Sequence, residues 1–408
     1  MVQETTVSPL APTGFPDIPA VDGVTFSTCA AGVRYRGRPD VMLASLRPGT
    51  AIAGVFTQSS TRAAPVLDCQ AKLGSATDCG AAILVNSGNA NAFTGRAGIQ
   101  SVQAITQSVA EQLDLPEDRV FTASTGVIGE PLAHDRVTQS LTQLTASLQS
   151  DGIADAARAI MTTDTFEKGA YRHVQIGDQS VRIAGIAKGS GMIAPDMATM
   201  LVYVFTDALI DQAQLQTITS DCAERTFNRI TVDSDTSTSD SLMVAATGAS
   251  NVNVNDDIAF ETALYELMLD LAHQVVRDGE GATKFIEITV SGAETEADAK
   301  THALSIANSP LVKTAVAGED PNWGRVVMAI GKSGAPADRD LISIKFGDVL
   351  IAENGWVHPD YDESKAAAHM KGTHIRLQVD LGLGPSHVTV WTCDLTHGYI
   401  SINADYRS

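Results

Sequence analysis

Residues 188 to 201 read Lys-Gly-Ser-Gly-Met-Ile-Ala-Pro-Asp-Met-Ala-Thr-Met-Leu, so a lysine and a glycine-rich stretch lead into an apolar run. The apolar residues from Met200 to Phe205 predict a β-strand. Glycines let the backbone approach a ligand closely, and a rigid strand would hold the hydroxyl of Thr199 at its start. From these residues alone two interpretations stay open: a reactive threonine, or a plain turn that feeds a buried strand.

The remainder of the chain predicts a mixed α/β (α+β) fold. Apolar residues at steps of three and four predict helices over Ile99–Leu113, Val137–Leu148 and Ile258–Val276, and these helices would cover sheet faces. The length favours either two lobes or one large interwoven domain, and no linker between lobes is visible. Further strands are predicted at Ala81–Val85, Arg119–Ala123, Ile286–Val290, Val326–Ile330, Ile342–Phe346 and Val388–Trp391.

Composition excludes several classes of protein. With 48 acidic against 28 basic residues the formal net charge is −20, which disfavours a nucleic-acid partner in the absence of a basic patch. The five cysteines show no CxxC spacing, which argues against a thiolate metal site and is typical of a reducing compartment. No secretory signal and no apolar run of about 18 residues is visible, so we expect a cytoplasmic protein without a membrane span.

The stretch from Lys188 to Leu201 resembles the self-cleavage site of the ornithine acetyltransferase (glutamate N-acetyltransferase) family, which reads Lys-Gly-Ser-Gly-Met followed by Met-Ala-Thr-Met-Leu. The resemblance extends over essentially the whole chain. Six further family-like segments follow in the family's order, at residues 86–92, 124–129, 161–165, 277–285, 320–325 and 402–407.

The resemblance implies an autoprocessed, N-terminal-nucleophile-like enzyme that cuts its backbone between Ala198 and Thr199. The products would be an α chain of residues 1–198 and a β chain of residues 199–408, interwoven into one catalytic unit. A threonine hydroxyl can attack the carbonyl that precedes it, and the resulting ester hydrolyses more readily than an amide. Thr199 then carries a free α-amine with an ordinary pKa of about 7.7 to 8.0, which can act as the base for its own hydroxyl.

The family's other functional positions transfer to named residues of this chain. Thr125 and Gly126 would stabilise the tetrahedral oxyanion from a turn after the strand that ends at Ala123. Lys188 would pair with the α-carboxylate of an amino-acid substrate, and Glu280 would attract the side-chain ammonium of ornithine. The implied substrate-binding set is Thr162, Lys188, Thr199, Glu280, Asn403 and Ser408. The chain departs from the family pattern at Asp196, usually Asn, and at Ser408, usually Thr.

The implied reaction is ping-pong transfer of acetyl from N2-acetyl-L-ornithine, through acetyl-Thr199, to L-glutamate in the cyclic arginine pathway. It needs no metal or cofactor, and the resemblance leaves open whether acetyl-coenzyme A is a second donor. The family implies an α2β2 assembly of cleaved protomers.

Other functions stay open beside this one. They are an acetyltransferase of a clavulanate-type secondary-metabolite cluster, an amidohydrolase with an N-terminal threonine, and a non-catalytic binding or structural protein. The stretch from Gly324 to Ser333 resembles a phosphate-binding loop, but six residues separate its glycines where that loop has four, which argues against an ATP site.

Overall fold

The computed structural model describes residues 6–74, 78–194 and 200–404, and the chain divides into two compact units. The larger unit holds residues 13–228 and 235–275, and the smaller holds residues up to 12, residues 229–234, and residues from 276 onward. The chain passes between the units four times, which is why no single linker marks their boundary in the sequence. All three sheets combine parallel and antiparallel pairs, so the predicted α/β fold with mixed sheets in two lobes is confirmed.

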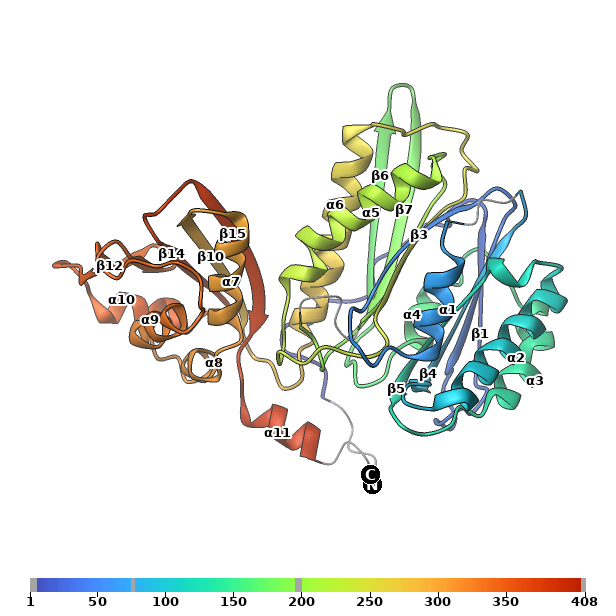
Figure 1. Ribbon diagram of the computed structural model, residues 1–408, viewed down its shortest axis with the longest axis horizontal. Coiled ribbons are helices and arrows are strands. Elements are labelled where there is room, and N and C mark those ends of the chain that lie inside the picture. Colours follow the sequence, from blue (N-terminus) through green and yellow to red (C-terminus); the bar gives the residue numbers. More distant parts are fainter. Residues whose placement is uncertain (1–5, 75–77, 195–199, 405–408) are drawn as a thin grey trace. The chain divides into compact units, whose positions relative to one another are not determined.

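The first sheet of the larger unit has four strands, in the order β1 (Val24–Cys29), β2 (Val41–Leu46), β4 (Ala81–Asn89) and β5 (Val120–Val127). Every residue of β4 is buried, because both faces of this sheet are covered. The outer face packs against α2 (Gly95–Leu113) and α3 (His134–Ala146), whose apolar residues contact Leu84 and its neighbours (Figure 1). Both helices and the strand at Ala81 were predicted.

The second sheet has five strands, in the order β3 (Ala51–Phe56), β9 (Ser241–Ala246), β8 (Leu201–Thr206), β7 (Gln179–Lys188) and β6 (Lys168–Ile176). Its helices are α5 (Gln212–Arg225) and α6 (Ile258–Arg277), and α6 approaches β7 at Gly185. Side-chain amides of Gln212 and Gln216 bond backbone groups of the edge strand β3, which satisfies polar groups that an edge strand leaves unpaired.

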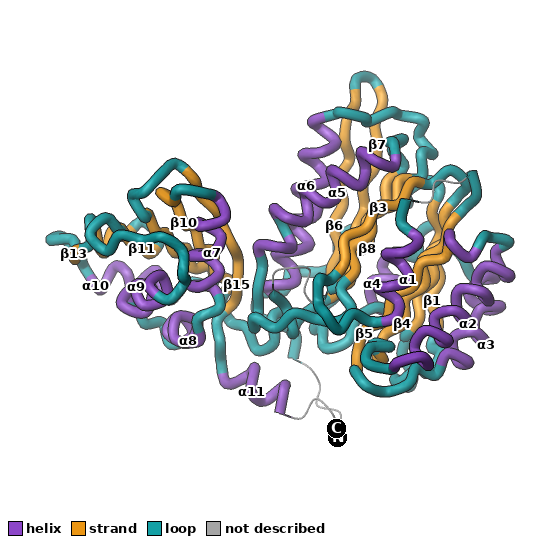
Figure 2. Tube along the Cα trace, viewed as in Figure 1, coloured by secondary structure: helices purple, strands orange, loops and turns teal. Residues whose placement is uncertain are grey.

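The inner faces of these two sheets share one hydrophobic core with α1 (Ala64–Lys72) and α4 (Ile153–Ala159). Phe26 of β1 meets Phe205 of β8 edge-on, with ring centroids 5.0 Å apart. In Figure 2 the purple helices α1 and α4 accordingly lie among the orange strands of this unit. The layered packing fixes the two sheets against each other, so residues at their strand ends are held in place.

The smaller unit contains a six-stranded sheet, and helices pack against this sheet to form a hydrophobic core. The strands follow the order β13 (Trp356–Val357), β12 (Val349–Glu353), β11 (Ser343–Phe346), β14 (His374–Asp380), β10 (Phe285–Ala293) and β15 (Ser386–Cys393). The core helices are α7 (Glu296–Ala307), α8 (Pro310–Ala317), α9 (Trp323–Gly331) and α10 (Glu363–Met370), and α11 (His397–Ala404) follows the sheet in the chain.

The predicted strand at Val326–Ile330 is wrong, because these residues belong to α9. Val326, Ala329 and Ile330 are buried at helical spacing, whereas Val327 and Met328 remain 40% and 38% exposed. Residues 324–331 of the stretch that resembles a phosphate loop lie in the same helix, so the backbone there forms no phosphate-binding loop. No helix in the described ranges is long and apolar enough to cross a membrane.

Candidate functional site

The described residues of the 188–201 stretch lie where β7 ends and β8 begins in the five-stranded sheet, and this end of the strands is called the sheet edge. Strand β7 runs antiparallel to β8, and β8 runs parallel to β9, so the end of β7 lies beside the starts of β8 and β9. In register, Lys188 pairs with Leu201, which pairs with Ser241. Lys188 on one side and the residue before Ser241, Asp240, on the other therefore flank the start of β8. Ala198, Thr199 and Asp196 precede β8 and lie outside the described residues.

A fully buried carboxylate, Asp164, organises the Lys188 side of this edge. Its Oδ1 accepts hydrogen bonds from Lys168 Nζ at 2.7 Å and from the Gly189 amide at 2.6 Å. Its Oδ2 accepts from the Thr162 amide at 3.0 Å and lies 4.0 Å from Lys188 Nζ. One side chain thus joins the segment that carries Thr162 to the glycine-rich stretch after Lys188.

The electrostatics of this cluster favour a buried anion between two buried cations. Burial alone would raise the pKa of Asp164, but the Lys168 and Lys188 ammonium groups and the hydrogen bonds hold that pKa well below its usual range. Asp164 is therefore ionised at neutral pH. The Lys188 side chain is only 3% exposed, so its cation is held in place and largely shielded from water. A fixed, desolvated ammonium is suited to binding a carboxylate.

Thr125 and Gly126 lie inside β5, which continues past the predicted strand end at Ala123 to Val127, so the predicted turn is wrong. They pair in register with Ser87 and Gly88 of β4. Gly126 has φ +131°, and a Cβ there would lie 2.3 Å from the Gly88 carbonyl carbon, so the close approach of the two strands requires glycine.

Side-chain hydrogen bonds fix the ends of these two strands. Ser124 donates to Asn86 Oδ1 at 2.6 Å, and the amide of Asn86 donates to the Asn89 carbonyl at 3.0 Å. The hydroxyl of Ser87 donates to the Ala159 carbonyl at 2.8 Å, where α4 ends. Because Thr162 follows α4 after two residues, this bond ties the end of β4 to the segment that contacts Asp164.

The smaller unit brings two other predicted residues together. Asn403 of α11 donates from Nδ2 to Glu280 Oε2 at 2.7 Å, and Glu280 is 8% exposed. Glu280 lies on the glycine-rich corner after α6, as predicted. A Cβ on Gly281 would lie 2.5 Å from the Tyr399 amide nitrogen, so this corner approaches α11 closely. Ser408 lies outside the described residues.

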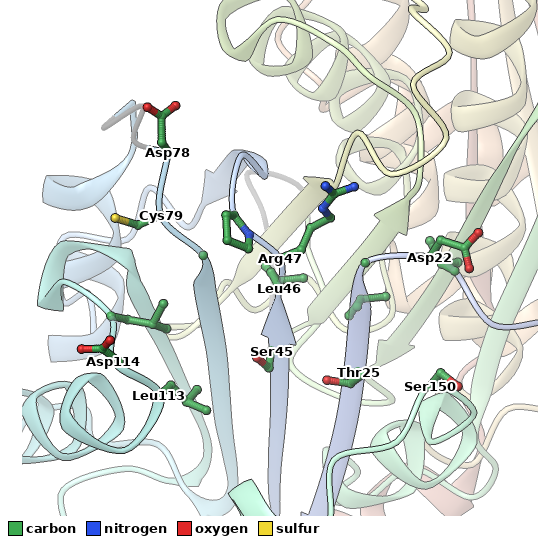
Figure 3. A pocket seen from close by; sticks show the side chains of 16 residues that line it. Asp22, Thr25, Ser45, Leu46, Arg47, Asp78, Cys79, Leu113, Asp114 and Ser150 are labelled. Carbon is green, nitrogen blue, oxygen red and sulfur yellow. The ribbon is translucent and has the colours of Figure 1, made fainter.

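A pocket of about 740 Å³ lies in the larger unit, at the end of the four-stranded sheet where β1 and β4 begin. It is lined by residues at the start of β1, the end of β2 and the approach to β4, including Thr25, Ser45 and Cys79 (Figure 3). Thr125 and Gly126 lie at the opposite ends of β4 and β5, and none of the predicted site residues that the structure describes lines this pocket. In the described ranges no group of three or more His, Cys, Asp or Glu residues could hold a metal ion.

Sequence reasoning assigned no role to Asp164, Lys168 or Asp240. Asp164 and Lys168 are four residues apart, but spacing alone cannot show that both are buried. Asp240 had a usable signal, since a carboxylate stands immediately before the apolar run Ser241–Ala246. Because Asp240 directly precedes this run, its position in the sequence already places it at the start of a strand.

Comparison with known proteins shows one family along nearly the whole chain. The model of the ArgJ family matches residues 25–408. The arginine biosynthesis bifunctional protein ArgJ of Ruegeria pomeroyi is 66% identical over 408 residues, covering all of both chains. The protein of the same name from Gluconobacter oxydans is 55% identical over 414 residues, covering 100% of this chain and 97% of that one.

Among solved structures, an arginine biosynthesis bifunctional protein ArgJ from Bacillus halodurans is 42% identical with a TM-score of 0.47. It covers 48% of this chain, and 95% of that chain is matched. The family match and the full-length identities agree with each other, and the chain belongs to the ArgJ family.

Proposed function

We propose that this protein is a self-cleaving acetyltransferase of arginine biosynthesis, which moves the acetyl group of N2-acetyl-L-ornithine to L-glutamate. The observation that carries the proposal is the 66% identity, over the full length of both chains, to an arginine biosynthesis bifunctional protein. The buried Lys188 ammonium beside Asp164 at the sheet edge also supports the proposal, because it is suited to binding the carboxylate of an amino-acid substrate.

In the proposed self-cleavage, Thr199 Oγ attacks the carbonyl carbon of Ala198 and the amide C–N bond breaks. The acyl group moves to oxygen, and the Thr199 nitrogen takes up a proton and becomes a free amine. Water then hydrolyses the ester, which leaves a carboxylate on Ala198 and restores the hydroxyl. The place of Thr199 in the sequence, two residues before the first residue of β8, supports this step because a buried strand limits the freedom of the chain that precedes it.

In the proposed transfer, the same hydroxyl attacks the acetyl carbonyl of N-acetylornithine while the α-amine of Thr199 accepts its proton. The proton passes to the departing nitrogen, ornithine leaves, and acetyl-Thr199 remains. The amine of glutamate then attacks this ester to give N-acetylglutamate and free Thr199. Thr125 and Gly126 would stabilise the oxyanion of each step, and the rigid pairing of β4 with β5 supports that role. The chemistry requires no metal and no cofactor.

Substrate recognition in this proposal uses opposite charges. Lys188 pairs with the α-carboxylate common to both amino acids, and Glu280 attracts the ammonium of the ornithine side chain. Thr162, Asn403 and Ser408 add neutral hydrogen bonds. The shielded ammonium of Lys188 supports the first assignment, and the buried carboxylate of Glu280 supports the second.

We further propose that the cleaved chains assemble as an α2β2 heterotetramer in the cytoplasm, with amino acids as substrates and with no nucleic acid or membrane as partner. The net charge of −20 supports the exclusion of nucleic acid.

The intact mass of denatured protein tests self-cleavage. Wild type should give two chains, ending at Ala198 and beginning at Thr199, whereas Thr199→Ala should give one chain of 42.8 kDa. Thr199→Ser is the matched control, because it keeps a hydroxyl and should still be cut. A single uncut wild-type chain would overturn the proposal.

A second measurement tests the acyl donor and acceptor. N-acetylornithine should add about 42 Da to the β chain alone, the increment of an acetyl ester, and glutamate should then remove it as N-acetylglutamate. Loss of the ester to water at the same rate without glutamate would indicate an amidohydrolase. Cleavage without acetylation would point to a different acyl donor, as in a secondary-metabolite enzyme. Because the relatives are named bifunctional, acetyl-coenzyme A is the second donor to assay.

A further inference from the structure

Asp240 holds the backbone of the residue that follows the proposed nucleophile. Its side chain is fully buried at the start of β9, and its Oδ1 accepts a hydrogen bond from the Met200 amide at 3.0 Å. The next residue, Ser241, donates its own amide to the Met200 carbonyl at 3.2 Å. Both polar backbone groups of Met200 are therefore bound by two consecutive residues, and one of the two bonds comes from a carboxyl group.

The other oxygen of Asp240 lies in an unusual environment for a carboxylate. Oδ2 is buried and makes no hydrogen bond of ordinary geometry among the described residues, although the Thr57 side chain is close enough to lower the pKa of Asp240. Three strands lie around Asp240. Thr57, which follows β3, donates its amide to the Asp240 carbonyl. Met200 directly precedes β8, and Lys188 is the last residue of β7. Of these groups only Lys188 is charged, and Lys188 also faces Asp164.

Burial raises the pKa of Asp240 well above its ordinary value, and the opposing effects of the Met200 amide, the Lys188 ammonium and the Thr57 side chain are smaller. Asp164, on the other side of Lys188, has its pKa shifted in the opposite direction. The pKa values of two carboxyl groups at one sheet edge are thus shifted in opposite directions. Such separation is typical of sites where one group must stay charged and another neutral.

We propose that Asp240 is a positioning residue, whose side-chain oxygen fixes the backbone next to Thr199 for self-cleavage and acetyl transfer. The proposal rests on the function proposed above. The attacking hydroxyl must lie close to its target carbonyl, and small displacements are costly in rate. Ionisation of Asp240 would add a second anion that competes for the Lys188 ammonium.

Three variants test this role. Asp240→Ala removes the acceptor for the Met200 amide and should slow self-cleavage about tenfold or more, as expected for a buried N–H that loses its partner. Asp240→Asn keeps a carbonyl oxygen in the same place and should cleave at a rate close to wild type. The matched control is Asp207→Asn, since Asp207 is also a buried carboxyl with a raised pKa but follows the opposite end of β8.

Cleavage is followed in time courses of cell-free synthesis, and kcat and KM are measured on cleaved protein over a range of pH. Wild type and Asp207→Asn should lose kcat as the pH rises through the raised pKa of Asp240, whereas Asp240→Asn should keep it, with KM unchanged. A purely structural role would not change the shape of the pH profile.

Protein stability provides an independent readout. Because the pKa of Asp240 is raised in the fold, its neutral form contributes stability that is present below the ordinary pKa of Asp and declines as the pH rises toward the folded value. Asp240→Asn cannot ionise, so its free energy of unfolding should lack this dependence.

The outcomes separate the two proposals. If wild type is not cleaved, the proposed function fails and the role of Asp240 fails with it. If wild type is cleaved, then Asp240→Ala cleaving at the wild-type rate, or Asp240→Asn keeping the wild-type decline of kcat with rising pH, refutes the role of Asp240 alone. Should Asp240→Ala fail to fold, the pH profile of Asp240→Asn still decides.

Discussion

Gly126 occupies a place in β5 where any side chain would collide with β4. A Cβ at this residue would lie 2.3 Å from the carbonyl carbon of Gly88 and 2.6 Å from its oxygen, and both neighbours are backbone atoms. Backbone atoms cannot rotate away as the end of a side chain can. The positive φ of +131° adds a second reason for glycine.

Gly126→Ala should therefore separate the ends of β4 and β5 and displace the proposed oxyanion donors. We expect a loss of about 10² to 10³ in kcat, the usual cost of one such donor, together with lower stability. Steady-state kinetics and urea denaturation measure the two effects. Gly129→Ala is the control, because Gly129 also has a positive φ, of +86°, but nothing lies within 4 Å of its Cβ position. Equal kinetic losses in both variants would contradict the argument.

Lys188 shows how burial changes the chemistry of one side chain. A lysine in a glycine-rich sequence is normally solvated, but this ammonium is nearly enclosed and lies 4.0 Å from the ionised Asp164. Because Lys168 already donates to Asp164 at 2.7 Å, the carboxylate does not neutralise Lys188 alone. The cluster of two cations and one anion keeps positive charge at the sheet edge, where a substrate carboxylate would bind.

Helix α9 illustrates the limit of pattern reading for a short apolar run. Val-Val-Met-Ala-Ile has the composition of a buried strand, but residues of the helix are buried on one face only. The signal for a helix lay before the run, where Asn322 caps α9 by accepting a hydrogen bond from the Arg325 amide at 3.3 Å.

Asn322→Ala should lower the free energy of unfolding by about 0.5–2 kcal/mol, because the first turn of α9 loses its cap. Asn322→Asp restores an acceptor and should recover most of the loss, since a carboxylate also suits a helix N-terminus. Chemical denaturation of the three proteins measures both effects. An alanine variant as stable as wild type would show that the cap contributes nothing.

At the scale of the whole molecule, the proposed cleavage point divides the chain but not the fold. The five-stranded sheet takes β3, β6 and β7 from before residue 198 and β8 and β9 from after it. Two ladders, β7 with β8 and β3 with β9, join the two parts, and each has six residue pairs. The shared core between the two sheets adds buried apolar surface from both parts.

The cleaved α and β chains should therefore stay together in native buffer and separate only in denaturant. Size-exclusion chromatography and native mass spectrometry would show one species that contains both chains. The uncut Thr199→Ala protein is the reference for its mass and size. Chains that separate without denaturant would contradict the interwoven arrangement.

The sequence by itself determined the fold class, the three long helices, most of the predicted strands and the family, whereas the site residues stay predictions. These properties follow from local sequence patterns and motifs, which do not depend on how distant parts of the chain pack together. It also placed Glu280 on a glycine-rich corner, and the structure confirms that place.

Only the tertiary structure decided which side chains share one environment. Asp164, Lys188 and Asp240 come from distant parts of the sequence, and strand pairing brings them to one sheet edge. Whether a carboxyl is charged depends on its burial and on the charges around it, and neither quantity is a property of sequence spacing. That is why a motif could single out Thr199 as a candidate, while the opposite pKa shifts of Asp164 and Asp240 became visible only once the strands were paired.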